Sequence, residues 1–169
     1  MNTNWNLPNT IVQYAEDDSH IQWSTDDFSL LRTRNNGISL SKPLLHIARQ
    51  PRNDITMKTW FVSATNFNFT NLPNTISGIQ CRLTVDRVGR VFDETIQLTL
   101  NNTLIGENKC SMTVDPVQIY GGSTDVWKVD NISSIIQDPA FGIVIRLKSH
   151  PSWPHKTTPI LRGIELQIC

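Results

Sequence analysis

The sequence predicts an all-β fold, an antiparallel β-sandwich, from two observations. Apolar and polar residues alternate in several runs, most clearly where Ile79, Cys81, Leu83 and Val85 are separated by polar residues. Turn-forming residues lie between these runs. Alternation with period two is typical of a strand that buries one face. Such strands need a second sheet to cover their apolar faces, so two packed antiparallel sheets are expected.

The alternation and the turn residues place the elements along the chain. The expected strands cover residues 10–14, 38–40, 44–49, 58–69, 79–86, 93–100, 104–106, 141–147 and 164–168. Asn101 and Asn102 predict a two-residue hairpin, and the glycines of 121–122 predict positive φ angles. Residues 132–136 can form one helical turn, capped by Asp130 or Asn131 and ended by Asp138 and Pro139.

The first 41 residues differ from the rest, because they contain acidic pairs and scattered aromatic residues but little sustained alternation. We therefore expect an N-terminal arm over residues 1–41 and a sandwich domain over residues 42–169. The arm is either an irregular wrap over the sandwich or a docking segment that becomes ordered on a partner. In the second case its apolar residues would bind the partner: Trp5, Leu7, Trp23 and Phe28.

Composition excludes several classes of function. The 15 basic and 15 acidic residues give a formal charge of zero, which disfavours nucleic-acid binding. No run approaches the ~20 apolar residues of a membrane helix, and no secretory signal is recognised at Met1. The three cysteines, Cys81, Cys110 and Cys169, have no metal-ligand spacing and fit a reducing compartment.

No convincing catalytic or metal centre is predicted, and no cofactor. His150 and His155 lie in a proline-bounded loop that lacks the geometry of a metal site. The acidic pairs 17–18 and 26–27 could bind calcium, but solvated loop charges explain them better. A hydrolase would need two carboxyl groups, for which Asp93 with Glu94 or Asp125 are candidates. Alternation places Asp93 and Glu94 on opposite faces of their strand.

Trp127 and Trp153 are the candidates for contact with a glycan or another subunit. Both are expected near loops, where an exposed indole stacks on a sugar or fills a pocket of a neighbour. The alternative for each is packing over the open end of the sandwich. Packing is favoured for Trp127, whereas Trp153 lies between two prolines and both alternatives stay open.

Six stretches resemble, in their order and spacing, the pattern of a β-domain of bacteriophage virion proteins. They are FNFTNLPNTISGI (67–79), DETIQL (93–98), IGENK (105–109), YGGSTDVW (120–127), FGI (141–143) and IELQI (164–168). In these stretches the chain resembles that family over about two-thirds of its length. It departs from the family pattern at Lys128, where glycine is frequent, and at Cys169, where an aromatic residue is usual.

The resemblance implies a jelly-roll-like sandwich with a structural role in the virion, at the neck, at the tail or baseplate, or as a decoration of the capsid. It implies a non-enzymatic protein whose partners are other virion proteins and copies of itself, made in the host cytoplasm and located in the virion. The alternative function is a carbohydrate-binding module for host surface glycans. A hydrolase that uses Asp93 or Asp125 is the third hypothesis.

Overall fold

The computed structural model describes most of the chain. The described residues are 2–15, 20–29, 31, 37–39, 41–42, 47–49, 53–55, 57–87, 91–113, 115–149 and 156–169. Strands dominate them, and the one helix among them is a single turn. No helix of this part of the chain has the length and apolar character needed to span a membrane.

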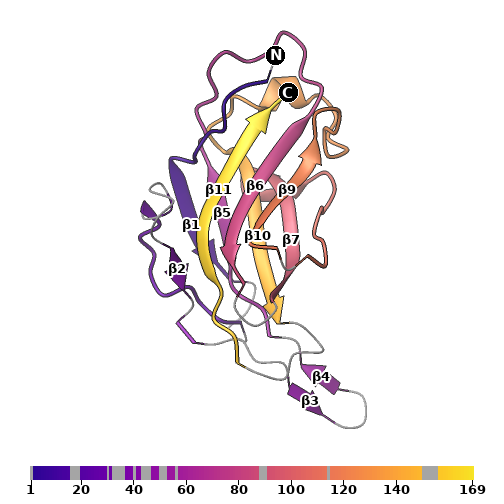
Figure 1. Cartoon of the computed structure of the whole chain (residues 1–169). Helices are drawn as coiled ribbons and strands as arrows, with labels where there is room; N and C mark the ends of the chain where they lie inside the picture. Colours follow the sequence, from indigo (N-terminus) through magenta and orange to yellow (C-terminus); the bar gives the residue numbers. More distant parts are fainter. Residues whose placement is uncertain are drawn as a thin grey trace.

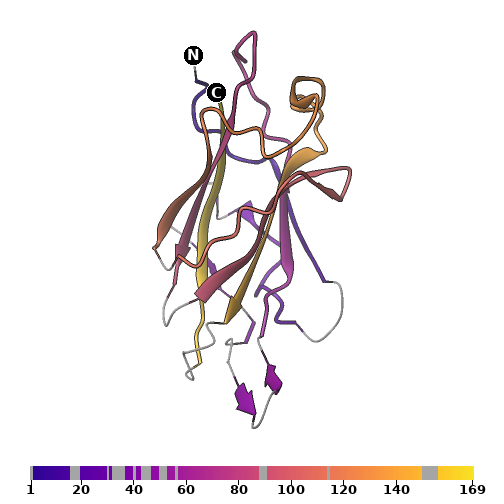
Figure 2. The same ribbon diagram turned by 90° about the vertical axis from the view of Figure 1, so that its right-hand side faces the viewer.

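Two antiparallel sheets form the body of the molecule, one in front of the other in Figure 1 and edge-on in Figure 2. The first sheet has the order β1 (Thr10–Tyr14), β5 (Phe61–Thr65), β10 (Phe141–Ser149), β7 (Val91–Leu100) and β8 (Thr103–Ile105). The second has the order β2 (Ile38–Ser39), β11 (Ile160–Ile168), β6 (Ile79–Asp86) and β9 (Val117–Gly122). A separate hairpin, β3 (Ile47–Arg49) and β4 (Asn53–Ile55), lies at one end, and helix α1 (Ile132–Ile135) lies at the other (Figure 1).

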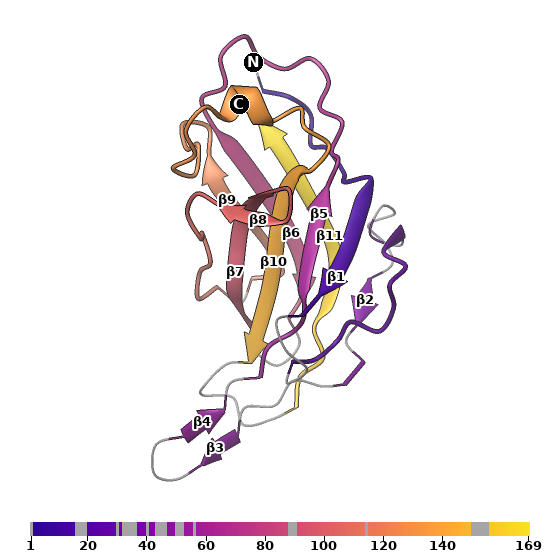
Figure 3. The same ribbon diagram turned by 180° about the vertical axis from the view of Figure 1, so that it is seen from behind.

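The connectivity is that of a jelly roll. The strand pairs are nested along the chain: β7 pairs with β8, β6 with β9, β5 with β10, and β2 with β11. A long hairpin that winds into two sheets produces this nesting, and it distributes the eight strands four to each sheet. Strand β1 is an addition, because it extends the first sheet beyond β5 (Figure 3). The predicted all-β sandwich is confirmed.

The core lies between the sheets and is built from the alternating residues. Ile79, Cys81, Leu83 and Val85 of β6 are completely buried, while the residues between them are partly exposed. Strand β10 differs from the expected pattern, since nearly all of it is buried on both faces. It is the central strand of its sheet, and neighbouring side chains cover its outer face as well.

The described part of residues 1–41 is built into the sandwich. Strand β1 pairs along its length with β5, and β2 pairs with β11. Before β1, the backbone N–H groups of Thr3 and Asn6 donate to the carbonyl groups of Ile168 and Leu166 at 2.8 Å. The N-terminal segment therefore runs beside the second sheet and then joins the first.

Several predicted boundaries change for local reasons. The strand expected over 58–69 ends at Thr65, because Asn66 and Asn68 adopt positive φ angles of 57° and 47°. Such backbone interrupts a strand. The hairpin at Asn101 and Asn102 is confirmed, since both have positive φ. The helix is also confirmed, but the side chain of Asn131 makes no capping hydrogen bond.

Candidate functional site

Two of the six stretches that resemble the virion β-domain, 105–109 and 120–127, meet at the C-terminal end of β9. The backbone N–H of Glu107 donates to the carbonyl of Trp127 at 2.8 Å. The Lys109 ammonium lies 2.8 Å from a carboxylate oxygen of Glu107 and 2.9 Å from one of Asp125. Together with Gly121, these residues form a contact cluster that we call the motif junction. Its residues hold two distant segments of the chain together.

Trp127 is the centre of the motif junction and is completely buried. Its indole Nε1 donates to the carbonyl of Ile79 at 2.9 Å, and its backbone N–H donates to Asp125 Oδ1 at 2.8 Å. Gly121 has a φ of +75°, and a Cβ there would lie 2.5 Å from the indole nitrogen. The glycine thus makes room for the tryptophan. The packing alternative holds for Trp127, which offers no surface to a glycan or another subunit.

The charges of the motif junction stabilise one another. Hydrogen bonds from Lys109 and Lys128 lower the pKa of Glu107. Burial raises the pKa of Asp125, but hydrogen bonds from Lys109 and from the Trp127 backbone outweigh it, so the pKa is lowered. The pKa of Lys109 is raised by its hydrogen bonds to Glu107 and Asp125. These groups are ionised near neutral pH and act as a local clamp.

A buried ion pair lies directly after the C-terminal end of β6. Arg87 Nη2 lies 2.8 Å from Asp93 Oδ1, and both side chains are almost completely buried. Arg87 also donates to the carbonyl groups of Val91 and Asp115 at 3.0 Å. The Tyr120 hydroxyl donates to Asp93 Oδ2. Burial and then the Asp93 charge raise the pKa of Tyr120.

The carboxylates of the hydrolase hypothesis are therefore engaged in separate structural contacts. Asp93 is bound by Arg87 and Tyr120 inside the sandwich, and Asp125 is bound by Lys109 in the motif junction. The Glu94 carboxylate has a different partner, since its Oε1 lies 3.2 Å from the Lys58 ammonium. The structure does not bring these acids together as a pair that faces a common pocket.

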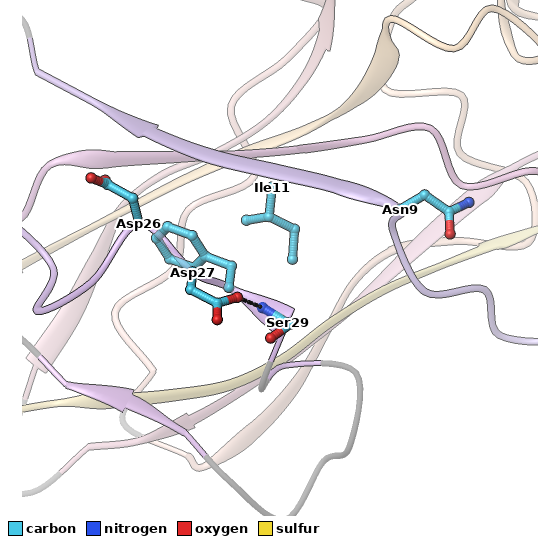
Figure 4. Close-up of a pocket in the computed structure, with 6 residues that line it drawn as sticks. Asn9, Ile11, Asp26, Asp27 and Ser29 are labelled. Carbon is cyan, nitrogen blue, oxygen red and sulfur yellow. Dashed lines mark hydrogen bonds between the residues drawn. The ribbon is translucent and has the colours of Figure 1, made fainter.

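The acidic pair 26–27 borders a shallow pocket with Asn9, Ile11 and Ser29 (Figure 4). Asp27 accepts a hydrogen bond from the Ser29 backbone N–H at 3.0 Å, and Asp26 accepts one from Gln13 Nε2 at 2.7 Å. Figure 4 shows the two carboxylates turned apart. No group of three metal-ligating acids, histidines or cysteines occurs among the described residues.

Several other predicted positions lie outside the described residues. They are the acidic pair 17–18, His150, Trp153 and His155. Predictions on them stay predictions.

The structure corrects two of the four arm residues proposed to bind a partner. Trp23 and Phe28 are 1% and 3% exposed and belong to the core of their own chain. The Trp23 indole also donates to the carbonyl of Trp60 at 3.2 Å. They are buried because β1 and β2, on either side of them, join the two sheets. Trp5 and Leu7 remain partly exposed, and the Arg82 guanidinium lies over the Trp5 ring at 4.4 Å.

An apolar surface that the sequence did not reveal lies on the outer face of the second sheet. Val117 and Ile119 of β9 are 52% and 47% exposed and project from the same face of this edge strand. Beside Val117 lies a shallow groove of about 260 Å³, which we call the β9 groove. It is lined by Arg82, Thr84, Val117, Arg162, Gly163 and Glu165.

The floor of the β9 groove is open because Gly163 has no side chain. A Cβ at Gly163 would meet only Thr84, at the ordinary contact distance of 3.8 Å. Arg82 forms a bidentate ion pair with Glu165, with N–O distances of 2.7 and 2.9 Å. This pair fixes one wall of the groove, and Val117 forms the other. The groove can hold an apolar side chain of another molecule.

Strand β9 was not predicted, and that explains why this surface was missed. In residues 117–122 the alternation is short and ends in two glycines, so it resembles a loop. The signal that could have revealed the strand is the alternation of Val117 and Ile119, which are exposed, with Gln118 and Tyr120, which are less exposed. Comparisons of the chain with models of known protein families, with curated proteins and with solved structures find no match.

Proposed function

We propose that this protein is a non-enzymatic structural component of a bacteriophage virion that acts by assembly with other virion proteins or copies of itself. The ordered stretches shared with a virion β-domain support this proposal, as does the jelly-roll sandwich that they build. The virion location rests on that resemblance. Residues of two of those stretches, 105–109 and 120–127, bind one another in the motif junction and therefore stabilise the fold. We assign the contact with a partner to other residues.

The observation that carries the proposal is the exposed apolar strand at the sheet edge. In the described structure β9 pairs with β6 on one side, and its other side borders no strand. An open edge can accept a strand from another chain through backbone hydrogen bonds, while pockets beside it select the side chains. Val117, Ile119 and the β9 groove supply apolar contacts next to this edge. Trp5 and Leu7 are second contact candidates.

The alternative function, a glycan-binding module, loses one of its two proposed platforms because Trp127 is buried. Trp153 lies outside the described residues and remains a prediction. A glycan site would have to use other side chains.

Cryo-electron microscopy of intact phage particles purified from a lysate in which this protein is made tests the proposal directly. We expect a sandwich of this size in symmetric copies, with β9 turned towards a neighbour. Particles that lack the chain would contradict the proposed role. If the chain is present but β9 faces solvent, the virion role is supported and the proposed contact through β9 is contradicted.

Edge variants test the contact independently. Val117→Asp and Ile119→Asp place a charge in the proposed interface, and burying an unpaired charge is costly. We expect both to abolish incorporation into particles while the isolated chain stays folded. Leu104→Asp is the matched control, because Leu104 is 40% exposed on β8, an edge strand of the other sheet. Equal loss in all three variants would contradict a specific role of β9.

A further inference from the structure

A second pocket lies at the end of the sandwich that carries α1. It has a volume of about 340 Å³, within the lower range of small-molecule sites. Two short segments line it, one directly after β5 and one directly after α1, and both lie at this end in Figure 3. The lining residues are Asn66, Phe67, Asn68, Phe69, Ile136, Gln137, Asp138 and Pro139.

The wall after β5 is fixed by contacts within the chain. The backbone N–H and the side-chain amide of Asn9 both donate to the carbonyl of Asn66, at 3.0 and 2.9 Å. The rings of Phe67 and Phe69 stack with centroids 5.7 Å apart and planes 7° from parallel. Phe67 is anchored in the core, while Phe69 stays partly exposed. This wall therefore presents an aromatic ring in a defined position.

The wall after α1 is also fixed. The backbone N–H of Asp138 donates to Ile135 at 3.0 Å, and its carbonyl accepts from Phe141 at 2.9 Å. Its carboxylate accepts a hydrogen bond from the Ala140 backbone N–H at 2.8 Å. A site whose groups are already in place loses little conformational entropy when it binds a ligand. The backbone of both walls meets this condition, as do the Phe69 ring and the Asp138 carboxylate.

Among the side chains that line the pocket are two amides and one carboxylate, of Asn68, Gln137 and Asp138, which can form hydrogen bonds with the hydroxyl groups of a ligand. Asn68 and Gln137 are exposed, and their amides make no hydrogen bond within the part of the chain that the structure describes. An amide both donates and accepts, and a carboxylate accepts strongly. The described residues that line the pocket include no lysine or arginine, so they offer an anionic ligand no counter-charge.

We propose that this pocket binds a neutral saccharide. A sugar ring combines an apolar C–H face with hydroxyl groups at its rim. The face would lie against Phe69, and the hydroxyl groups would bind the side chains of Asn68, Gln137 and Asp138. The site is separate from the β9 groove and does not depend on the proposed virion role.

Titration of the full-length ¹⁵N-labelled chain with neutral sugars tests the proposal. The probes are glucose, galactose, mannose, N-acetylglucosamine and maltose, with N-acetylneuraminic acid and inorganic phosphate as charged probes. We expect at least one neutral sugar to bind with a dissociation constant of about 1 mM, an interaction of about 4 kcal/mol. The shifted amide signals should lie in residues 66–69 and 136–139. No saturable binding of any neutral sugar, or shifts confined to other residues, would overturn the proposal.

Two variants and one control locate the site. Asn68→Gly removes the amide but tolerates the positive φ, and Gln137→Ala changes an exposed side chain. We expect each to weaken binding by about tenfold, the value of one hydrogen bond. Asn102→Gly is the control, because Asn102 is also exposed and has a φ of 62°. Unchanged affinity in both test variants, or equal binding of the charged probes, would contradict a neutral-sugar site.

Discussion

The two ends of strand β9 behave in opposite ways. At its C-terminal end Gly121 adjoins the motif junction, where Trp127 is completely buried. At its N-terminal end Val117 and Ile119 are about half exposed and belong to no recognisable motif. The difference teaches that the residues of the motif junction stabilise the fold. The exposed apolar residues Val117 and Ile119 lie outside the stretches that resemble the virion β-domain.

Truncation of Trp127 gives the largest expected effect. Trp127→Ala leaves a cavity and an unpaired Ile79 carbonyl, so we expect the free energy of unfolding to fall by about 3–5 kcal/mol. Urea unfolding measures it. Trp5→Ala is the control, since it removes a partly exposed ring and a cation–π contact of about 1 kcal/mol. Equal losses in the two variants would break the distinction between core and surface tryptophans.

Removal of Arg87 tests the buried charges behind β9. Arg87→Met leaves the Asp93 carboxylate buried without its cation, and we expect a loss of about 3–5 kcal/mol in the free energy of unfolding. The double variant Arg87→Met/Asp93→Leu should recover part of it, because both charges are then absent. Lys128→Met is the control, since Lys128 is 77% exposed and its surface ion pair with Glu107 contributes little to stability. A double variant no better than the single one would contradict this account.

Much of the fold could be predicted from the sequence, because alternation is a local signal. The strand over Ile79–Asp86 and the short helix were predicted close to their observed bounds. The integration of Trp23 and Phe28 was not, since it depends on β1 and β2 reaching two different sheets. Pairing between residues distant in sequence leaves no local pattern.

The candidate surfaces were harder to predict than the core. The β9 groove joins β6, β9 and β11, and the pocket beside α1 joins two loops about 70 residues apart in the chain. Each brings together residues from distant segments, so no single local motif reveals it. Trp127, by contrast, was conspicuous in the sequence, and its burial follows from Gly121 and from the carbonyl of Ile79. Packing was the alternative that the sequence favoured for Trp127, but its contact with Gly121 became evident only in the structure.

The pH dependence of stability sharpens the description of the motif junction. The folded-state pKa values of Glu107 and Asp125 are lowered, so their contribution is complete above their ordinary values of 4.5 and 3.8. It is lost as the pH falls through the lower folded-state values. Lys109→Gln removes the shared cation, so we expect lower stability at pH 7 and a smaller loss on acidification towards pH 3.

Chemical unfolding at a series of pH values measures this effect. The curves of the wild type and Lys109→Gln should approach each other as the pH falls. Lys156→Gln is the control, because Lys156 is exposed and outside the motif junction, and its curve should stay parallel to that of the wild type. Parallel curves for Lys109→Gln and the wild type would show that the ion pairs of Lys109 with Glu107 and Asp125 do not contribute to stability.

Filling the β9 groove has the smallest expected effect on stability and tests the exposed end of β9. Gly163→Val places a side chain on the groove floor, where a Cβ meets only Thr84 at 3.8 Å. Gly163 is buried, but the added Cβ makes only an ordinary contact, so we expect the free energy of unfolding to change by about 1 kcal/mol or less, which urea unfolding measures. Incorporation into particles should nevertheless fall, as we expect for Val117→Asp, because the added side chain would occupy the space that we propose for a partner. A folded variant with full incorporation would show that the partner binds the β9 edge without entering the groove.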